Sequence, residues 1–399
     1  MVATGHALRP LSWSPIASAL GESLPTSSGA ANDPPKRDGP GRDQAASGSQ
    51  SEVPVMERAD RSTDQPPEPA AVPAEPTPVS IMSLPARMRF SLLDPWRQAR
   101  PAQRFAAIVG AALMVVGLAH LAGWLVVGGA WAGPVSLRKP TTFGMSFGLT
   151  TITLAWVAGQ LRISDRTRWL LLGPLAAADA YEVAWVSVQR WRGVASHFNF
   201  GTRLDTGLFL GGGVAIAVTV TVILALTVLA FTAIRSTPSM AMAIRAGLLI
   251  LLVAQGVGGW IVQHGVGPAS DGATTGLTTL GSAGVMKVPH AVAIHAIQVL
   301  PALAWLLSLA TLAERRRTHL VAAATFGYVA LVAVSLLQTA AGVAPLDLGV
   351  VAAVLYLLGV GLLGAAFVAA LLALRNPGST ATRTTGLAQI VRGSSSAEP

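Results

Sequence analysis

The chain has 399 residues and no cysteine. Disulfides, thiolate metal sites, iron–sulfur clusters and cysteine nucleophiles are therefore excluded. Charged residues are scarce too, at 12% of the chain, whereas a soluble domain carries about 25%. Hydrophobic residues make up 52%, and the mean hydropathy is +0.54. Together these proportions indicate an integral membrane protein, whose main partner is the lipid bilayer.

A nucleic-acid partner is not expected, although the formal net charge is +9. The Lys and Arg residues lie mainly beside apolar segments and not on one soluble face, so we interpret them as topology signals. The chain also lacks an internal repeat, and sequence symmetry therefore gives no support to an inverted-repeat transporter.

Four segments differ in composition along the chain. Residues 1–85 are rich in Pro, Ser, Gly and Ala and have no sustained apolar period. Such a segment buries too little apolar surface to offset its ordering entropy, so we predict a disordered tail. A basic juxtamembrane segment follows at 86–104, then a transmembrane bundle at 105–374 and a short cytoplasmic tail at 375–399.

Eight apolar segments have about the 20 residues that a hydrocarbon core of about 30 Å requires. The predicted fold is therefore all-α, a polytopic transmembrane helix bundle of about eight spans. Glycine pairs at Gly144/Gly148 and Gly207/Gly211 are expected to let helix backbones approach closely. The predicted spans are 105–127, 142–161, 168–188, 206–233, 241–263, 290–313, 318–340 and 347–374.

The basic residues of the short loops predict the orientation. Arginines precede the first predicted span and recur in alternate loops, at 162–168, 235–245 and 315–317, and Arg375 follows the last span. This side is predicted to be cytoplasmic, with both termini on it, in a multi-pass protein of the cell membrane. The loops predicted to face outward are 128–141, 189–205, 264–289 and 341–346.

Five of the seven histidines fall in the outer half of this topology. They are His120, His197, His264, His290 and His295. A single histidine of this kind is more often a hydrogen-bonded or interfacial residue, but together they match what imidazole does, which is to ligate Fe, Cu or Zn or to relay protons.

Two cofactor hypotheses follow from these histidines. A b-type haem needs two imidazoles from facing helices, and His120 or His264 opposite His295 would supply them. A transition-metal site would use His197, His290 and His295. Since His290 and His295 point about 140° apart on an ideal helix, they would chelate one metal only if the helix unwinds near Pro289.

The third predicted span carries two carboxyl groups, Asp179 and Glu182, three residues apart and therefore on one face, with Gln189 continuing the stripe. A charged side chain at that depth costs about 2.5 kcal/mol or more, so it is expected to face the bundle interior or a cavity. Proton sharing, cation binding or pairing with a base such as Arg138 would satisfy the pair. A purely structural buried pair is the alternative.

Basic residues in three outward loops oppose the topology rule. They are Arg138 and Lys139, then Arg190, Arg192 and Arg203, then Lys287. Snorkelling to phospholipid headgroups explains them in one interpretation, and binding of an anionic solute in another. The Gly- and Thr-rich loop at 264–288 is expected to be a lid or a connector, and it matches no phosphate, dinucleotide or calcium motif.

Three stretches carry a family resemblance: RKPTTFGMSFGLTTITLAW (138–156), QRWRGVASHFNFGTRLD (189–205) and PHAVAIHAIQVLP (289–301). They resemble a family of uncharacterised multipass bacterial integral membrane proteins, over about residues 100–315. The resemblance implies the place of a site and not its activity. The site residues that it implies are Lys139, Pro140, Arg192, Gly193, Ser196, His197, Asn199, Asp205, His290, His295 and Gln298.

We therefore expect an outward-facing pocket of histidines, basic residues and carboxylates that takes a small molecule or an ion, and we do not expect an enzyme. Three hypotheses stay open: a metal or b-type haem site with a redox or sensing role, a proton- or cation-coupled transporter of a small solute, and a non-catalytic membrane partner in a complex. The polar residues expected in the pocket are Arg138, Lys139, Asp179, Glu182, Gln189, Arg192, Asn199, Asp205 and Gln298.

Overall fold

The computed structural model describes residues 88 and 96–375, which all belong to one unit, Ala74–Pro399. The predicted tail at 1–85, most of the predicted basic segment before residue 96, and residues 376–399 lie outside the described residues.

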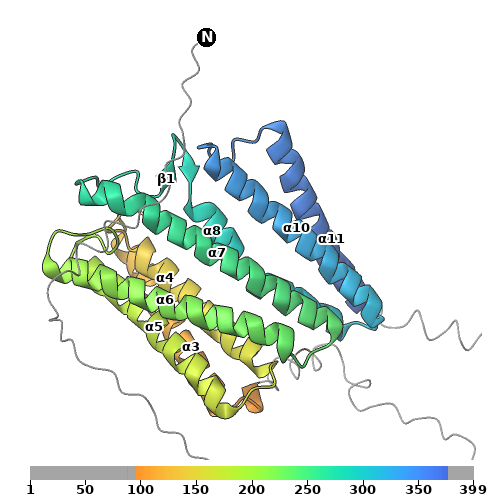
Figure 1. The fold of residues 1–399 in the computed structure, drawn as a ribbon. Coiled ribbons are helices and arrows are strands. Elements are labelled where there is room, and N and C mark those ends of the chain that lie inside the picture. The colour runs from red at the N-terminus through yellow and green to blue at the C-terminus, as the bar shows by residue number, and fades with distance from the viewer. Residues whose placement is uncertain (1–87, 89–95, 376–399) are drawn as a thin grey trace, which may run out of the picture. The chain divides into compact units, whose positions relative to one another are not determined.

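The described residues form eight helical rods of membrane-spanning length, one of which is made of two consecutive helices (Figure 1). The all-α prediction is confirmed, and each predicted span coincides with one rod. The helices are α3 (Pro101–Val127), α4 (Arg138–Gly159), α5 (Asp165–Trp191), α6 (Arg203–Thr232), α7 (Pro238–Ser270), α8 (Lys287–Ile294), α9 (Ala296–Leu309), α10 (Glu314–Ala340) and α11 (Val350–Arg375).

Seven of these rods are long and apolar enough to cross a membrane, and the chain is a multipass membrane protein. The eighth rod is α5, which has 27 residues like α3 and α10. It is less apolar because Asp179 and Glu182 interrupt its middle, and these side chains are 0% and 1% exposed. Since both carboxyl groups face the protein interior and not lipid, α5 is a span that carries the polar site.

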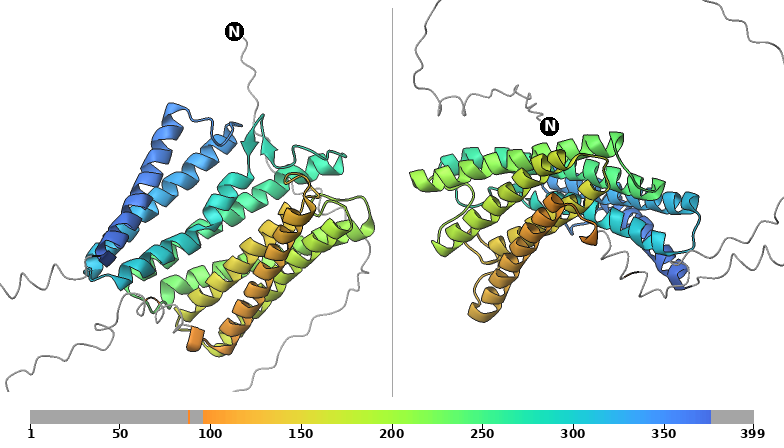
Figure 2. Two further views of the ribbon diagram at one scale, coloured as in Figure 1. Left: turned by 180° about the vertical axis from the view of Figure 1, so that it is seen from behind. Right: turned by 90° about the horizontal axis from the view of Figure 1, so that it is seen from below.

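Helices that follow one another in sequence pack on each other, and α3 also packs on α5 and α7 on α10 (Figures 1 and 2). Helices α3 to α6 form one side of the bundle, and α7 to α11 form the other. The two sides meet mainly where α6 packs on α7, and also where α4 touches α9. A continuous core of buried Leu, Ile, Val and Ala side chains joins them, including Leu154, Leu226, Leu248 and Leu300.

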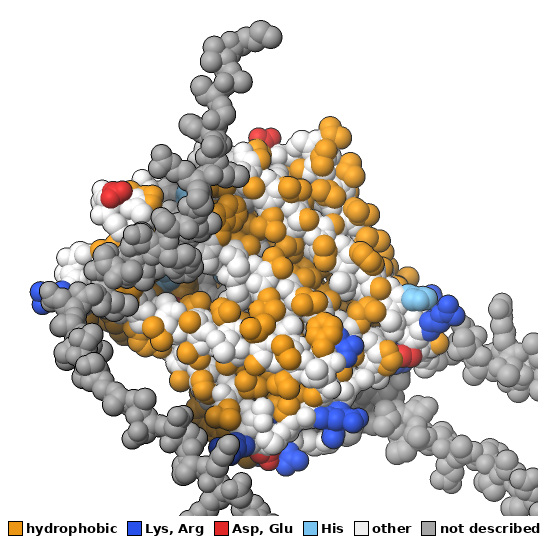
Figure 3. Space-filling view, viewed as in Figure 1, with side chains coloured by type: hydrophobic (Ala, Val, Ile, Leu, Met, Phe, Trp, Pro, Cys, Tyr) orange, Lys and Arg blue, Asp and Glu red, His pale blue; other side chains and the backbone are white. Residues whose placement is uncertain are grey.

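The two ends of the bundle differ in charge. Because eight rods alternate in direction, α3 begins and α11 ends at the same end, which also holds the loops at 160–164, 233–237 and 310–313. We call this the arginine-rich end. In Figure 3 most of the visible Lys and Arg side chains lie along the edge where α6 ends and α10 begins, and hydrophobic side chains cover the face above it. We call the other end the opposite end.

Two local features differ from the prediction. Helix α7 continues to Ser270, so the connector predicted at 264–288 is shorter, and it contains a hairpin of β1 (Thr279–Leu280) and β2 (Gly284–Val285). The hairpin packs on the α10–α11 loop, where Ala283 N donates to Gly342 O at 3.0 Å. The sixth span also has a break that was not predicted, at His295 between α8 and α9, while Pro289, where a shared His290–His295 metal site would need the helix to unwind, lies within α8.

Helices α3 and α4 pack backbone to backbone through glycine. A Cβ atom at Gly117 would lie 2.9 Å from Met145 N and from Thr141 O, and one at Gly144 would lie 2.6 Å from Leu113 O. Real side chains do not approach this closely, so the contact requires glycine. For Gly144 and Gly148 the predicted close approach is therefore confirmed, whereas Gly207 has no heavy atom within 4 Å of its Cβ position.

Gly117→Ala is expected to lower the free energy of unfolding by about 1–3 kcal/mol, because the new methyl group must push two backbones apart. Gly123→Ala is the matched control: it lies on the same helix, and its Cβ position has no heavy atom within 4 Å. The control is expected to change the free energy of unfolding by less than about 0.5 kcal/mol. Unfolding of the detergent-purified protein measures both, and equal effects would contradict this packing.

Candidate functional site

The Asp179 carboxyl group lies at the centre of the α3–α6 side of the bundle. Its Oδ2 is 2.6 Å from the Thr151 hydroxyl of α4, and its Oδ1 accepts a hydrogen bond from the Thr219 hydroxyl of α6 at 2.9 Å. The side chain is fully buried. Three helices therefore meet at one carboxyl group.

Glu182 lies one turn further along the same face of α5. Its Oε2 accepts a hydrogen bond from Trp185 Nε1 at 3.2 Å. Its Oε1 is buried without a hydrogen-bond partner among the described residues. That oxygen lies against Gly212 of α6, where a Cβ atom would come within 3.0 Å of it. Glycine at position 212 thus leaves room for the carboxyl group.

Neither carboxyl group has a basic partner in the described part of the chain. The ion pairs found there are Arg100–Asp165, Arg168–Asp165, Arg192–Asp205 and Arg317–Glu314. Pairing of Asp179 or Glu182 with Arg138, one of the predicted solutions, does not occur among these residues: Arg138 Nε instead donates to Trp131 O at 3.1 Å.

The helix break at His295 faces the carboxyl site across α4. When the side-chain amide of Gln298 is oriented so that its oxygen and its nitrogen both have suitable partners, the nitrogen donates to Ile294 O at 3.0 Å and to His295 O at 3.2 Å. The amide also lies 3.5 Å from the Thr150 hydroxyl, next in sequence to Thr151. Gln298 therefore adds side-chain hydrogen bonds to the backbone at the break and links α9 to the α4 segment that holds Asp179.

His197 lies in the α5–α6 loop and inserts between aromatic rings. It stacks on Trp185 with ring centroids 4.8 Å apart, and it meets Phe143 edge-on at 5.3 Å. Its Nδ1 is 3.1 Å from the Ser196 hydroxyl. Trp185 therefore contacts both Glu182 and His197.

The residue after His197 has an unusual backbone. Phe198 has φ of +57°, a left-handed conformation that non-glycine residues adopt rarely. Its ring packs on Phe209 at 5.6 Å and lies against Gly265 of α7, where a Cβ atom would be 2.7 Å from the ring. These contacts hold the strained residue in place and connect the loop to the other side of the bundle.

Burial lowers the pKa of His197 well below its usual value of 6.5, and the positive charges of Lys139 and Lys287 lower it further. The imidazole therefore stays neutral at neutral pH. A neutral ring packed between aromatic groups is stable there, whereas an imidazolium ion would lose its hydration without gaining an anionic partner.

Gln189, Arg192 and Asp205, all expected in the pocket, do come together at the opposite end. Asp205 Oδ1 accepts hydrogen bonds from Arg192 at 2.6 Å and from Gln189 Nε2 at 2.8 Å, and Arg192 also donates to Gln189 Oε1. Thr202 caps α6 and donates to Asp205 Oδ2 at 2.7 Å. The group ties the end of α5 to the start of α6. Asn199 stabilises the same loop, because its Nδ2 donates to Ala195 O at 2.9 Å.

The other four histidines lie toward the same end but in separate surroundings. His120 Nδ1 is 2.8 Å from Val116 O, and its ring stacks on Trp191 of α5 at 5.8 Å. His264 Nε2 is 3.1 Å from Thr279 O, at the hairpin. His290 Nδ1 is 2.8 Å from Ala254 O of α7. His295 occupies the helix break.

The structure does not bring the three predicted metal ligands into one group. Over residues 88 and 96–375, no set of three or more His, Asp or Glu side chains is arranged to hold a metal ion. His197 is enclosed by Phe143 and Trp185, and His290 is bound to an α7 carbonyl. The polar centre is therefore built from carboxyl and hydroxyl groups, with the imidazoles around it.

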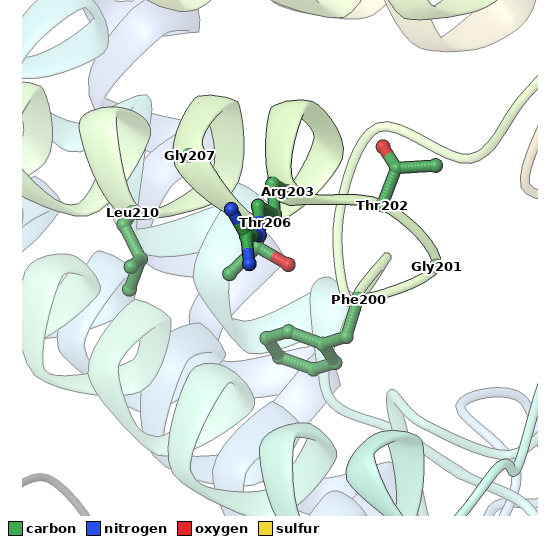
Figure 4. Close-up of a pocket in the computed structure, with 7 residues that line it drawn as sticks. All are labelled: Phe200, Gly201, Thr202, Arg203, Thr206, Gly207 and Leu210. Atoms are coloured by element: carbon green, nitrogen blue, oxygen red, sulfur yellow. The ribbon is translucent and has the colours of Figure 1, made fainter. Parts of the chain in front are cut away.

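Two surface hollows lie at the opposite end, and neither contains the carboxyl pair. The larger, of about 500 Å³, lies at the start of α6, where Arg203 and Thr206 lie beside Phe200 (Figure 4). The smaller, of about 300 Å³, lies under the α3–α4 loop and includes Arg190 and Trp124. Arg190 and Arg203 thus line surface hollows and are separate from the buried site.

Sequence reasoning missed the residues that complete the site: Thr151, Thr219, Trp185 and Gly212. Threonine is common in apolar helices and carries no hydropathy signal of its own. One signal was present, since Thr150 and Thr151 lie on α4 within the first resembling stretch. Hydroxyl groups on a neighbouring span are suitable hydrogen-bond partners for the carboxyl groups of α5.

Comparisons of the chain with protein-family models, with curated proteins and with solved structures gave no match. The family resemblance noted from the sequence is therefore supported only at the level of a multipass helical membrane protein.

Acid is expected to destabilise the protein in part through His197. Since the folded-state pKa lies below the unfolded value of about 6.5, the unfolded chain binds a proton first, and the stabilisation is complete above that pH and lost as the pH falls below it. His197→Phe, which keeps a ring without a titrating group, should reduce the slope of unfolding free energy against pH by up to about 1.4 kcal/mol per pH unit.

Unfolding of the purified protein at a series of pH values measures this slope. The exposed His319 of α10 provides the control His319→Gln, which should leave the slope unchanged. An identical acid dependence in the parent protein and in His197→Phe would contradict the assignment of a neutral, buried His197.

Proposed function

We propose that this multipass membrane protein is a proton-coupled transporter of a small solute, and that Asp179 and Glu182 bind the coupling proton. The positive-inside rule places the arginine-rich end in the cytoplasm. The opposite end, with Lys139, His197 and Lys287, is then the outer entrance.

The main support for the proposal is the number of hydrogen atoms available for the hydrogen bonds of Thr151. Its hydroxyl oxygen lies 2.7 Å from Phe147 O and 2.6 Å from Asp179 Oδ2. A hydroxyl group has one hydrogen and can donate only once, and a backbone carbonyl only accepts. Both short contacts are satisfied together when Thr151 donates to Phe147 O and Asp179 carries a proton that it donates to Thr151. The geometry therefore suits a proton-binding carboxyl group.

Glu182 supports the same interpretation. It is 1% exposed, lacks a basic partner among the described residues, and has one oxygen without a hydrogen bond. A carboxylate buried in a membrane needs a counter-charge, and a bound proton is the smallest one. Two such groups one helical turn apart form a relay that needs no metal ligand.

The position of the pair also suits coupling. Asp179 joins α4, α5 and α6, and the neighbouring Thr150 lies at Gln298, beside the helix break. In membrane transporters, broken helices at membrane depth are a usual place for solute and coupling-ion sites. Release of the proton would leave a charge on Asp179 beside Thr151, the neighbour in sequence of the residue that contacts the break, and this would favour a different packing of the two sides of the bundle.

The metal, haem and non-catalytic hypotheses receive less support. The five histidines occupy separate surroundings, and three of the rings bond to backbone carbonyls of α3, of α7 and of the hairpin. A merely structural membrane partner would not need two unpaired buried carboxyl groups.

Dicyclohexylcarbodiimide reacts with protonated carboxyl groups in apolar surroundings and provides a direct test. In membranes, mass spectrometry is expected to find the adduct on Glu182 or Asp179 and not on Glu314, which lies at the arginine-rich end beside Arg317. Labelling should decline as the pH rises. Absence of an adduct on both residues would refute the assignment of the proton-binding site.

Coupled transport is tested in proteoliposomes that contain a pH-sensitive dye, with a panel of amino acids, sugars, carboxylates and inorganic anions supplied outside. At least one solute is expected to change the internal pH, and Asp179→Asn or Glu182→Gln should reduce that change at least about tenfold, the scale of one lost charged interaction. Asp165→Asn, at the exposed arginine-rich end, is the control that should retain it. If the rate of solute uptake were the same with and without a pH gradient, and the same in the two variants as in the parent protein, proton coupling would be contradicted.

A further inference from the structure

Two helices begin with basic residues at the opposite end of the bundle. Arg138 and Lys139 open α4, Lys287 opens α8, and neither helix has an acidic residue in its first turn. The N-terminus of a helix is its positive pole, so cations are unfavourable there and anions are favourable. The positive helix termini and the three basic side chains therefore both attract negative charge.

Lys139 and Lys287 have no anionic partner in the described part of the chain. Neither ammonium group forms an ion pair or a hydrogen bond with another residue of 96–375, whereas Arg192 at the same end is paired with Asp205. Lys139 is half-buried and Lys287 is exposed. Snorkelling to water explains one isolated lysine, but it does not explain two that lie within electrostatic range of each other.

Lys139 and Lys287 both lie within electrostatic range of His197. Phe143, one turn after Lys139 on the same face of α4, contacts the His197 ring at 5.3 Å. The charges of both Lys139 and Lys287 act on that ring. A histidine ring carries at least one N–H that it can donate, so the group combines two lysine side chains with an imidazole donor.

We propose that Lys139, Lys287 and His197 bind a small oxyanion, a carboxylate or a phosphate group, at the opposite end of the bundle. Ammonium and imidazole N–H groups bind oxyanions through short, charge-assisted hydrogen bonds. The inference deepens the proposed function and rests on it, because it identifies the transported solute as an oxyanion. Entry of an anion together with a proton also keeps the charge moved across the membrane small.

Trp185 connects this site to the proton-binding pair. One edge of its indole donates to Glu182, and one face stacks on His197. Binding of an anion at His197 and binding of a proton at Glu182 thus act on the same side chain. This contact supplies a route by which one event favours the other.

Anion binding is measured on the full chain purified in detergent without added phospholipid, by titration of acetate, benzoate and inorganic phosphate against thermal unfolding and by calorimetry. At least one of these anions is expected to stabilise the parent protein. Lys139→Gln and Lys287→Gln should weaken binding at least about tenfold, the effect of one lost charge-assisted contact. Arg203→Gln removes an exposed cation of the same end and should change it less than about twofold.

A second arm distinguishes a soluble oxyanion from a lipid headgroup. The protein is placed in nanodiscs of phosphatidylcholine or of phosphatidylglycerol. If only phosphatidylglycerol stabilises it, and the two lysine variants lose that effect, the oxyanion site stands with a lipid phosphate as its ligand. If no anion or lipid stabilises the protein, or if Arg203→Gln loses binding as much as the lysine variants do, the proposal is overturned.

The same measurements separate this inference from the proposed function. Carbodiimide labelling and anion titration are both made on the parent protein, so neither result depends on a variant of the proton-binding pair. Retained anion binding without carbodiimide labelling would refute the coupling proton and leave the anion site intact. Labelling of Glu182 without anion binding would refute the oxyanion site and leave the proton-binding pair intact.

Discussion

The burial of two carboxyl groups in the middle of a membrane helix is the constraint on which the rest of the structure depends. Lipid cannot solvate Asp179 or Glu182, so α5 must be surrounded by protein on that face. Helix α4 supplies Thr151, and α6 supplies Thr219 and the space at Gly212. The order in which α4, α5 and α6 pack is thus the order that satisfies these two groups, and the apolar faces of α3 and α11 are left for lipid.

The rods and their polar faces could be predicted because both depend on local sequence. A run of about 20 apolar residues specifies a span whatever its neighbours are. The spacing of three between Asp179 and Glu182 places them on one face of any α-helix, and the cost of exposing them to lipid turns that face inward. Gln189, Arg192 and Asp205 could be expected in one place for a similar reason, because a single short loop joins the helices that carry them.

Contacts between helices distant in sequence could not be predicted in this way. The depth of each histidine follows from its position along a span, but its direction around the bundle depends on which helices are neighbours. His120 therefore faces Trp191, and His290 faces the carbonyl of Ala254, although both lie toward the same end. The break at His295 has no signal at that residue either, since Pro289 and Pro301 both lie several residues away.

Trp185 is the side chain through which the proposed proton site and the proposed oxyanion site would act on each other, because it contacts both Glu182 and His197. A charge on Glu182 would strengthen its hydrogen bond with the indole N–H, and a proton on Glu182 would weaken it, because charge-assisted bonds are stronger. The indole is stacked on His197 at 4.8 Å, so a shift of the indole would disturb this contact. His197 is in turn followed by Phe198, whose strained backbone is held by contacts that reach Gly265 of α7. This series of contacts from the carboxyl pair thus reaches α7, on the other side of the bundle, where the proposed transport mechanism requires a change of packing.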